Sequence, residues 1–444
     1  MQENNSVCYT YVMLGFSDER KSFLDLVRKS ETRKLRAAEA LAFFDDKQDE
    51  TTAMLIKRRF ANPESFRVFQ VNIVKKIVSR RATAYQTPPV RTFEGWDQAA
   101  ATELYQNANI DAVLKRASKL TKLLKTTTLQ VVWTEPHGLQ VRVLTPNILD
   151  AEWTDPEHPE RMVVTHAASD PAKTTYADWS ATTYQRRNAN GHPIPTPGNA
   201  SNVNPYGVLP FVPLFDRLPD ADFFLPGGDD LMGAQKALNV GLTNLWRAVE
   251  LQSHGQAVAK GLPIGDPIQT GPDKVILLPK DGEFAYAAPN TPIPDILEAL
   301  EFLMRSTAST NDCTADVLDL SKTAESGSAR EAQRIDLKEA RLDDIALWRG
   351  YERRLFEVIK RVVNTHRPGT IPEAATIRAD FTELQDNLTE SEVLANLKER
   401  AELGISSPVD ALMTLNPDGY ATREDAYRAL LSRKQETEEL TLGL

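Results

Sequence analysis

The sequence predicts an α+β fold, in which amphipathic helices accompany a separate antiparallel sheet. Apolar residues recur at helical spacing over residues 328–363, a stretch without proline and with Gly350 as its one interior glycine. Residues 129–143 instead alternate apolar and polar side chains with a period of two, on both sides of a turn. A Gly- and Pro-rich segment, residues 255–292, separates two further amphipathic stretches, and within it residues 256–259, 275–278 and 284–287 have strand composition. We therefore expect long helices, one sheet region and a small β insert between two helices.

The N-terminal part of the chain is expected to be mostly helical. Apolar residues have helical spacing over residues 17–27 and 35–44. A basic amphipathic helix is expected from Asn72 to Tyr85, closed by the prolines at 88–89. A further helix is predicted over residues 97–124, where apolar side chains again return every three or four positions.

Strands are expected between residues 127 and 190, as one antiparallel sheet packed on the preceding helices. The alternation at 129–133 and 139–143 flanks the turn Glu135–Gly138, which is typical of a β-hairpin. Residues 193–226 are rich in Pro, Gly and Asn and are predicted to form a long ordered connection.

Three helices are expected next. Asp229 and Asp230 place carboxylates at the start of the first, where they favour the positive end of the helix dipole. The second begins at the prolines of residues 292–294 and runs to about residue 310. After a polar loop, Ser328 and Glu331 have the spacing of a capping box and start a helix that would span about 50 Å at 1.5 Å per residue.

The C-terminal region combines one strand with shorter helices. Residues 377–381 have strand composition, and a helix is expected from Thr389 to Leu403. A Ser-Ser-Pro phrase at 406–408 and the turn Asn416–Gly419 precede a last helix that ends near Leu440.

Length and composition restrict the possible classes of protein. At 444 residues the chain exceeds what one hydrophobic core usually serves, so two to four structural units are expected. No apolar run approaches the roughly 18 residues of a membrane span, and the N-terminus lacks signal-peptide features, so we expect a protein that stays in the cytosol in which it is made. The net charge of −10 argues against tight binding of nucleic acid, but it is compatible with a surface past which DNA slides.

Residues that would carry catalysis are scattered. Cys8 and Cys313 lie far apart and predict neither a disulfide nor a zinc site. No phosphate-binding loop occurs, and the histidines show no metal-binding spacing: His137, His158, His166, His192, His254 and His366. The adjacent pairs Asp229/Asp230 and Asp343/Asp344 are more typical of helix starts and solvated charges than of a Mg²⁺ site. We expect no enzyme activity, no metal and no cofactor.

Several phrases, taken with the order of elements, resemble one known family. These are the helix after Asn72, the phrase Tyr206–Pro213, the order helix, β insert, helix, polar loop and long helix, the loop end Ser326–Ala329, and the C-terminal phrases at 406–420. In this combination the chain resembles the portal proteins of tailed bacteriophages. The resemblance implies a helical stem, a long kinked or crossing helix, a β-rich wing, a small α/β clip and a helical C-terminal crown.

The resemblance also assigns these parts to residue ranges. They are 1–226 for the wing, 227–254 for the first stem helix, 255–292 for the clip, 293–310 for the second stem helix, 311–327 for the tunnel loop, 328–384 for the long helix and its return to the wing, and 385–444 for the crown. The tunnel loop departs from the family pattern, because it reads Leu-Ser-Lys-Thr-Ala-Glu where many portals are rich in glycine.

Function follows from the same resemblance. It implies a ring, with twelve copies as the expected number, at one capsid vertex of the virion, assembled in the host cytoplasm. The ring would pass double-stranded DNA during packaging and ejection. Its implied partners are the terminase large subunit, the major capsid and scaffolding proteins, and the neck and tail adaptor proteins.

Candidate contact residues are basic, because phosphates are touched by lysine and arginine without reading sequence. Lys322 is the one basic residue between Arg305 and Arg330 and is the first candidate for the bore; Arg330 is the second. Lys260, Lys274 and Lys280 are candidates in the clip for the motor or the adaptor. On sequence alone, a solvated loop residue remains an equal interpretation of Lys322.

Two other classes of protein stay open at this point. Another head or neck component of a phage would share the assembly properties without requiring a β insert between two helices. A soluble metal-dependent hydrolase would require converging titratable groups in one pocket.

Overall fold

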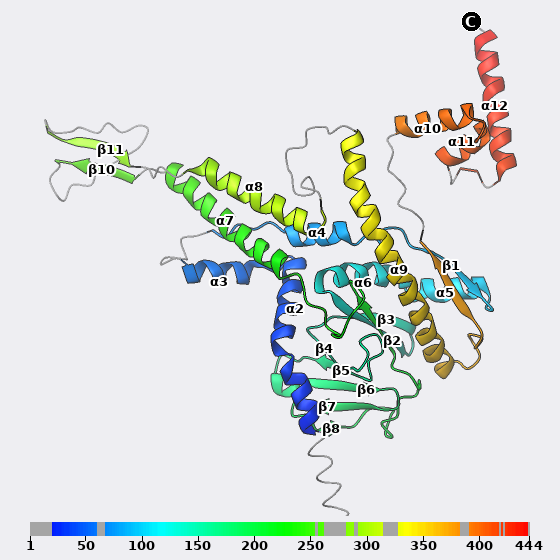
Figure 1. The fold of residues 1–444 in the computed structure, drawn as a ribbon, viewed down its shortest axis with the longest axis horizontal. Coiled ribbons are helices and arrows are strands. Elements are labelled where there is room, and N and C mark those ends of the chain that lie inside the picture. Colours follow the sequence, from blue (N-terminus) through cyan, green and yellow to red (C-terminus); the bar gives the residue numbers. More distant parts are fainter. Residues whose placement is uncertain are drawn as a thin grey trace, which may run out of the picture. The chain divides into compact units, whose positions relative to one another are not determined.

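The computed structural model of the protein describes residues 20–59, 67–253, 256–261, 281–287, 292–313, 327–381, 390–416, 419–420 and 422–442. The chain divides into two compact units, Met1–Thr382 and Glu383–Leu444. Helices and antiparallel strands are both abundant (Figure 1), which confirms the predicted α+β class.

The N-terminal helices are present. Residues 20–29 are helical and are followed by α2 (Glu31–Phe44), α3 (Asp49–Arg59) and α4 (Ile73–Arg81). Helix α4 begins after Asn72 as predicted, but it ends at Arg81 instead of reaching Tyr85. After Ala82 the main chain leaves the helical pattern, since Thr83 N bonds to Arg81 O and Gln86 N to Thr83 O. The carbonyls of Thr83 and Ala84 accept from Arg341 Nη1 at 2.8 and 3.2 Å.

The helix predicted over residues 97–124 is two helices, α5 (Gln98–Asn107) and α6 (Ile110–Leu124). Between them Asn109 has a φ of 51°, in the left-handed region that interrupts a right-handed helix and that asparagine tolerates better than most residues. The break redirects the chain, and α6 then packs its apolar face against the sheets.

A three-stranded sheet contains the predicted hairpin, β2 (Thr126–Thr134) and β3 (Gly138–Leu144), with Val131 opposite Val141. Its third strand, β9 (Phe211–Phe215), pairs with β2 and lies inside the segment predicted to be a connection. The connection was predicted from the Pro, Gly and Asn content of the segment, and proline cannot donate to a ladder. The sheet order β3-β2-β9 places β9 at an edge, where proline is tolerated.

A second, five-stranded sheet holds the remaining strands of this region, so the one sheet predicted for residues 127–190 is wrong. Its strands are β4 (Leu149–Glu152), β5 (Arg161–His166), β6 (Thr175–Ser180), β7 (Tyr184–Asn188) and β8 (Pro193–Ile194), in that order. A short 3-10 turn, η2 (Pro171–Lys173), connects β5 and β6.

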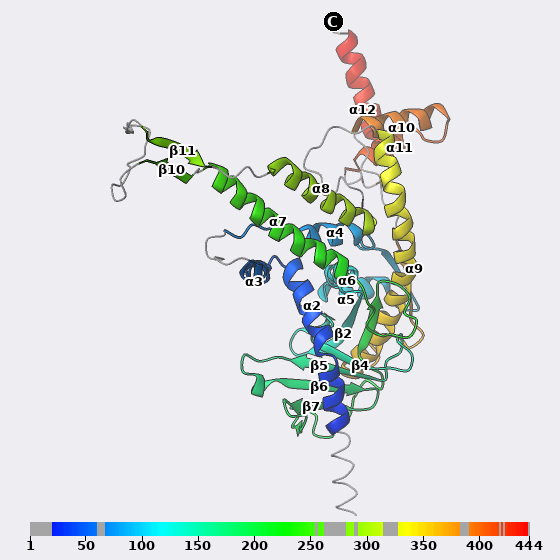
Figure 2. The ribbon, with the colours of Figure 1, turned by 60° about the vertical axis from the view of Figure 1, so that its left-hand side comes forward.

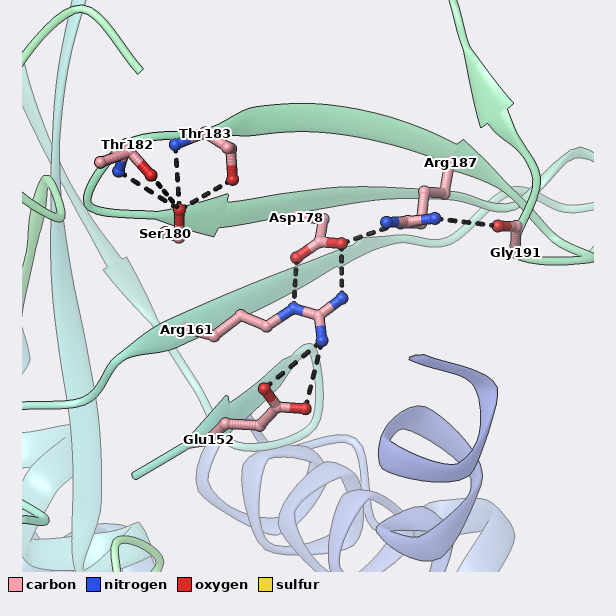
Figure 3. A network of polar contacts seen from close by, with 8 residues as sticks. All are labelled: Glu152, Arg161, Asp178, Ser180, Thr182, Thr183, Arg187 and Gly191. Atoms are coloured by element: carbon pink, nitrogen blue, oxygen red, sulfur yellow. Dashed lines mark hydrogen bonds and ion pairs between the residues drawn. The ribbon is translucent and has the colours of Figure 1, made fainter. Parts of the chain in front are cut away.

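A buried carboxylate joins the strands of the second sheet. Figure 3 shows Asp178 on β6 accepting from Arg161 Nε and Nη2, both at 2.7 Å, and from Arg187 Nε at 2.8 Å. Arg161 also reaches Glu152 on β4 at 3.2 Å. The Arg187 guanidinium lies over the ring of Phe23, 4.9 Å from its centroid, and so connects the N-terminal helix to this sheet.

Two helices run side by side after the sheets, α7 (Asp229–Ser253) and α8 (Ile293–Thr310), as Figure 1 and Figure 2 both show. They are antiparallel, because Asn311, just after α8, donates to Asp230 at the start of α7 at 3.3 Å. Gly241 permits their close approach: a Cβ at this position would lie 2.5 Å from Leu300 Cδ2.

Between these helices in the chain lies a β-hairpin, β10 (Gln256–Lys260) and β11 (Glu283–Ala287). Both strands were predicted, and Figure 1 shows the hairpin beyond the far ends of α7 and α8. The strand predicted at residues 275–278 lies outside the described residues.

The long helix α9 (Gly327–His366) has 40 residues and begins one residue before the predicted start. Its second half is buried in the main hydrophobic core, with Leu355, Phe356 and Ile359 fully covered. The chain then returns through β12 (Thr376–Asp380), which pairs with β1 (Val90–Glu94) from the N-terminal part. The predicted strand at 377–381 is therefore present, shifted by one residue.

The second unit consists of α10 (Glu390–Glu402), α11 (Pro408–Leu415) and α12 (Arg423–Leu442). Ser407 caps α11 in a capping box with Asp410, whose carboxylate accepts from Ser407 N at 2.8 Å. Helices α10 and α12 agree with the two helices predicted, whereas α11 was not predicted as a helix. Thr389, expected to cap the first helix, lies outside the described residues.

A buried polar ladder fixes α7 to the N-terminal helices on the side away from α8. Gln235 Oε1 accepts from Ile73 N and Val74 N at 2.9 and 3.2 Å, which satisfies two first-turn donors of α4. One turn later Asn239 donates to Gln48 and Thr52, at 3.0 and 3.2 Å. A further turn on, Thr243 accepts from Phe69 N at 3.1 Å. Three successive turns of α7 thus hold the start of α4, the side chains of Gln48 and Thr52, and the main chain of Phe69.

We predict that Gln235→Leu lowers the free energy of unfolding of the first unit by about 3 kcal/mol, because several buried main-chain and side-chain groups lose their partner. All 6 tryptophans lie in this unit, so urea unfolding followed by tryptophan fluorescence reports on it. Lys236→Leu is the matched control on the neighbouring, partly exposed position, with an effect below about 1 kcal/mol. Equal losses in the two variants would contradict the ladder's importance.

Candidate functional site

The described residues contain no group of three or more His, Cys, Asp or Glu side chains able to hold a metal ion. In one of the adjacent acidic pairs noted in the sequence, Asp343 is exposed, whereas Asp344 is buried and paired with Lys122 at 2.8 Å. The other pair, Asp229 and Asp230, lies exposed in the first turn of α7. Among these same residues, no helix has both the length and the apolar character required to cross a bilayer.

A cavity of about 310 Å³ lies where α2, α4 and α6 meet the start of α7. Five cations line it, and each has an acidic partner: Arg33 with Asp150, Arg36 with Asp229, Arg81 with Asp312, and both Lys122 and Lys125 with Asp216. Because these positive charges are already compensated, the cavity does not define a site for an anion.

Of the basic residues predicted as contacts, one can be placed completely. Lys260 stands on β10 directly opposite Glu283 on β11, with Nζ 3.7 Å from Oε2 and both side chains about three-quarters exposed, at 75% and 76%. An ion pair this exposed holds its partners weakly, so Lys260 stays accessible to a partner. Its role as a contact for the motor or the adaptor stays a prediction.

The other predicted contact residues are placed in part or not at all. The main chain of Arg330 belongs to the first turn of α9, and its side chain lies outside the described residues. Lys322, Lys274 and Lys280 also lie outside them, so the structure brings none of these together. Their contacts with DNA, motor or adaptor therefore stay predictions.

Helix α8 presents an apolar residue on the face turned away from α7. Leu300 and Leu303 pack toward α7, whereas Phe302 is 73% exposed. Leu297 on the same helix is also exposed, at 44%. Glu301 and Arg305 form an exposed ion pair beside them at 3.6 Å. Single exposed apolar side chains are common on protein surfaces, so this helix does not by itself define a binding site.

Helix α9 is attached to the core by a buried ionic cluster. Lys122 Nζ on α6 lies 2.7 Å from Asp216 Oδ1, just after β9, and 2.8 Å from Asp344 Oδ1 on α9. Lys125 Nζ approaches the other oxygen of Asp216 at 2.8 Å. Two cations thus face two carboxylates, and the cluster connects α6, the end of β9 and α9.

The two carboxylates of this cluster titrate in opposite directions. Burial by itself would raise the pKa of Asp216, but the charges and hydrogen bonds of Lys122 and Lys125 outweigh it and hold the pKa below its usual value. For Asp344, burial prevails over the single contact with Lys122 and raises the pKa above its usual value. The cluster therefore depends on Asp216 as its permanent negative charge.

A second buried charge, eight residues after Asp344 on α9, lies among residues of the main hydrophobic core. Glu352, only 1% exposed, accepts from Tyr85 Oη at 2.7 Å and from Arg91 Nη2 at 2.7 Å. Arg91 also donates to Asp111 at 2.7 Å. Burial, followed by the charge of Glu352, raises the pKa of Tyr85 well above its usual value, so its hydroxyl remains a donor at all physiological pH values.

Sequence reasoning missed these anchoring residues for two different reasons. Gln235, Asn239 and Thr243 are spaced four residues apart, a visible pattern, but it was hidden beside the stronger apolar stripe of the same helix. Arg91 and Glu352 are 261 residues apart, and no local signal connects them.

Comparisons with known proteins concern the fold. No protein-family model matches the sequence, and no curated protein matches it. The chain is similar to one in the neck of a native gene transfer agent (GTA) particle computed with C12 symmetry, with 11% identity, a TM-score of 0.45, and coverage of 83% of this chain and 94% of that one. It is also similar to a chain in the virion of the native GTA particle, with 13% identity, a TM-score of 0.45, and coverage of 82% and 98%.

A third structure of this kind is the neck of an empty GTA particle computed with C6 symmetry, with 14% identity, a TM-score of 0.41, and coverage of 80% of this chain and 94% of that one. The structural neighbours are thus chains of the neck and virion of a gene transfer agent.

We predict that Asp216→Asn lowers the stability of the first unit at pH 7 by about 3 kcal/mol, because two buried lysines lose their permanent counter-charge. The lowered pKa of Asp216 contributes stability above its unfolded value of about 3.9, and this stability is lost as the pH falls through the folded value. The variant should therefore lose less additional stability than the wild type between about pH 5 and pH 3.

Urea midpoints measured by tryptophan fluorescence across this pH range check the prediction. Asp344→Asn is the informative counterpart, because a raised pKa contributes stability at low pH that is lost as the pH rises. Replacing the Asp344 carboxyl should therefore make the loss of folding stability at acidic pH steeper than in the wild type. Parallel pH profiles for the wild type and both variants would overturn the assignment.

Proposed function

We propose that this chain is the portal subunit of a tailed-phage-like particle, assembling as a closed ring around a channel for double-stranded DNA. One observation carries the proposal. Helices α7 and α8 lie side by side and antiparallel, the hairpin β10–β11 separates them in the chain, and the 40-residue helix α9 follows. The resemblance of the sequence to portal proteins rests on this same order of elements.

A ring supplies what the single chain leaves uncovered. Subunits in a closed ring meet through two different surfaces, one from each neighbour. Phe302 on α8, 73% exposed, and Leu342 on α9, 64% exposed, are large apolar side chains on two of the helices concerned. Covering each of them would contribute about 1.5–3 kcal/mol per subunit. Charged residues around Phe302 would then select the neighbour's orientation.

In this proposal the ranges assigned from the sequence keep their roles. The wing is 1–226, the first stem helix 227–254, the clip 255–292, the second stem helix 293–310, the tunnel loop 311–327, the long helix and its return 328–384, and the crown 385–444. The ring, with twelve copies as the proposed number, occupies one vertex of the capsid in the virion after assembly in the host cytoplasm.

Its proposed partners are the terminase large subunit, the major capsid and scaffolding proteins, and the neck and tail adaptors. Lys260, Lys274 and Lys280 are the residues that we assign to the motor or the adaptor. All of these assignments depend on the ring.

The distribution of charge in this chain favours a channel through which DNA slides, rather than a protein that binds DNA tightly. The chain has a net charge of −10, and the five cations of the cavity beside α7 are all paired with carboxylates. Tight binding of DNA needs many unpaired cations that displace counterions from phosphates. Sparse positive charges, for which Lys322 and Arg330 are the candidates, would touch the DNA while allowing it to slide.

We predict that Phe302→Glu abolishes ring assembly and leaves the monomer folded, because the side chain is exposed in the single chain and buried in the proposed ring. Mass photometry at micromolar concentration and moderate salt measures the assembly. Leu218→Glu is the matched control, an equally drastic change at a position 64% exposed in a loop away from the helical pair. A wild-type protein that remains a monomer under these conditions would contradict the proposed function.

Lys322→Ala and Lys322→Glu are expected to reduce DNA packaging while ring assembly stays unchanged, with the larger effect for glutamate. The reason is that one charge per copy becomes a ring of charges facing phosphates. Packaged DNA per particle, measured by nuclease protection, tests this, and Lys322→Arg should retain packaging. Unchanged packaging in both the alanine and the glutamate variants would remove this residue from the mechanism.

A further inference from the structure

The sheet formed by β1 and β12 has two strands and therefore two outer edges. At the outer edge of β1, the side chain of Gln98 hydrogen-bonds to the main chain of the strand. Its Oε1 accepts from Phe93 N at 3.0 Å, and its Nε2 donates to Arg91 O at 2.9 Å. The main-chain groups of Arg91 and Phe93 thus point away from β12. This edge is closed by a residue of the chain itself.

The same contacts fix which groups point outward on β12. In an antiparallel pair, opposed residues either both bond across the ladder or both point away from it. Arg91 is opposite Ala379, and Phe93 is opposite Ile377. The N–H and C=O groups of Ile377 and Ala379 must therefore face outward. Ala375 lies two residues before Ile377 and faces the same way, and its carbonyl accepts from Lys360 Nζ of α9 at 3.0 Å.

Only the first of these three outward positions is capped. Among the residues that the structure describes, none forms a recorded hydrogen bond with the outward main-chain groups of Ile377 or Ala379. Beside them is a groove of about 360 Å³ between α9 and β12, lined by Arg349, Arg353, Ile377, Arg378, Ala379 and Asp380. An unpaired strand edge next to a groove is a template for another strand.

The groove carries excess positive charge. Arg349 and Arg353 are exposed, one helical turn apart, and neither has an acidic partner among the described residues. Arg378 is paired with Asp380 at 3.1 Å. Three arginines therefore meet one carboxylate in a chain whose net charge is −10.

We propose that the outer edge of β12 binds an extended acidic segment of a partner protein, which adds to the sheet as a third strand. Its main chain would bond Ile377 and Ala379, and its carboxylates would pair with Arg349 and Arg353. The spacing fits: four residues of helix rise about 6 Å, and alternate residues of a strand are about 6.8 Å apart. Carboxylates at alternate positions on the side facing α9 thus match the two arginines.

The open edge favours a peptide over a nucleic acid. A phosphate only accepts hydrogen bonds, so it would leave the outward carbonyls of Ile377 and Ala379 unbonded, whereas a peptide strand both donates and accepts. Arginines beside an open edge can also serve only to prevent aggregation, and they would then bind no acidic segment. The proposal is independent of the ring, since it concerns elements within one chain.

The test uses the full chain and an acetylated, amidated peptide of four Thr-Glu repeats carrying a fluorophore, with binding followed by anisotropy. We expect saturable binding that weakens about tenfold with Arg349→Ala and about tenfold with Arg353→Ala, since each removes one charge-assisted pair. Arg361→Ala is the matched control on the same helix, where the arginine is exposed and paired with Glu373 at 3.0 Å. It should leave binding unchanged.

Main-chain pairing is tested with the same peptide N-methylated at the residues that would face β12. Its binding should be lost, because the N–H donors are gone while the charge is kept. Absence of saturable binding by the wild type would overturn the proposal, and so would equal binding of the methylated peptide. It would also be overturned if an oligonucleotide of equal charge bound more tightly through the same arginines, or if Arg349→Ala reduced the mass of the protein in solution, which would make a second copy the occupant.

Discussion

The position of the long helix depends on buried charges that must find partners. A carboxylate as deeply buried as Glu352 is unfavourable unless it is paired, and Arg91 and Tyr85 provide its partners at 2.7 Å. The cluster of Lys122, Asp216 and Asp344 applies the same constraint lower on the helix. Because each partner comes from a different element, α9 cannot slide or rotate without leaving a charge alone in the core. The register of β12 with β1 follows, since the chain returns from the fixed end of α9.

Main-chain groups impose an equivalent constraint on α7. The first-turn donors Ile73 N and Val74 N of α4 have no intrahelical acceptor, and Gln235 supplies one. On its other side Gly241 lets α8 approach as closely as Leu300 permits. Helix α7 therefore has one face fixed by hydrogen bonds and another by close packing.

The sequence revealed what local periodicity encodes and missed what distant contacts decide. Helices α7, α8 and α9 and the hairpin β2–β3 were predictable, because each has a continuous apolar pattern and a clear start or turn. Strand β9 was not, since Pro213 is acceptable only at the edge position that the sheet order creates. The basic contact residues were chosen by charge alone. Charge does not reveal a partner across a ladder, such as Glu283 opposite Lys260.

The apolar stripe of α9 contains residues that are buried within the subunit and one residue that is exposed. Ile345, Leu355, Ile359 and Val362 follow the predicted stripe and are buried within the chain. Leu342 belongs to the same stripe but is 64% exposed, because the core ends beneath it. Among the residues that the structure describes, the stripe thus continues one turn beyond its buried part. Phe302 on α8 is exposed as well, so the described parts of both helices that flank the segment proposed as the tunnel loop keep a large apolar side chain at the surface. In the proposed ring, these are positions that neighbouring copies would cover.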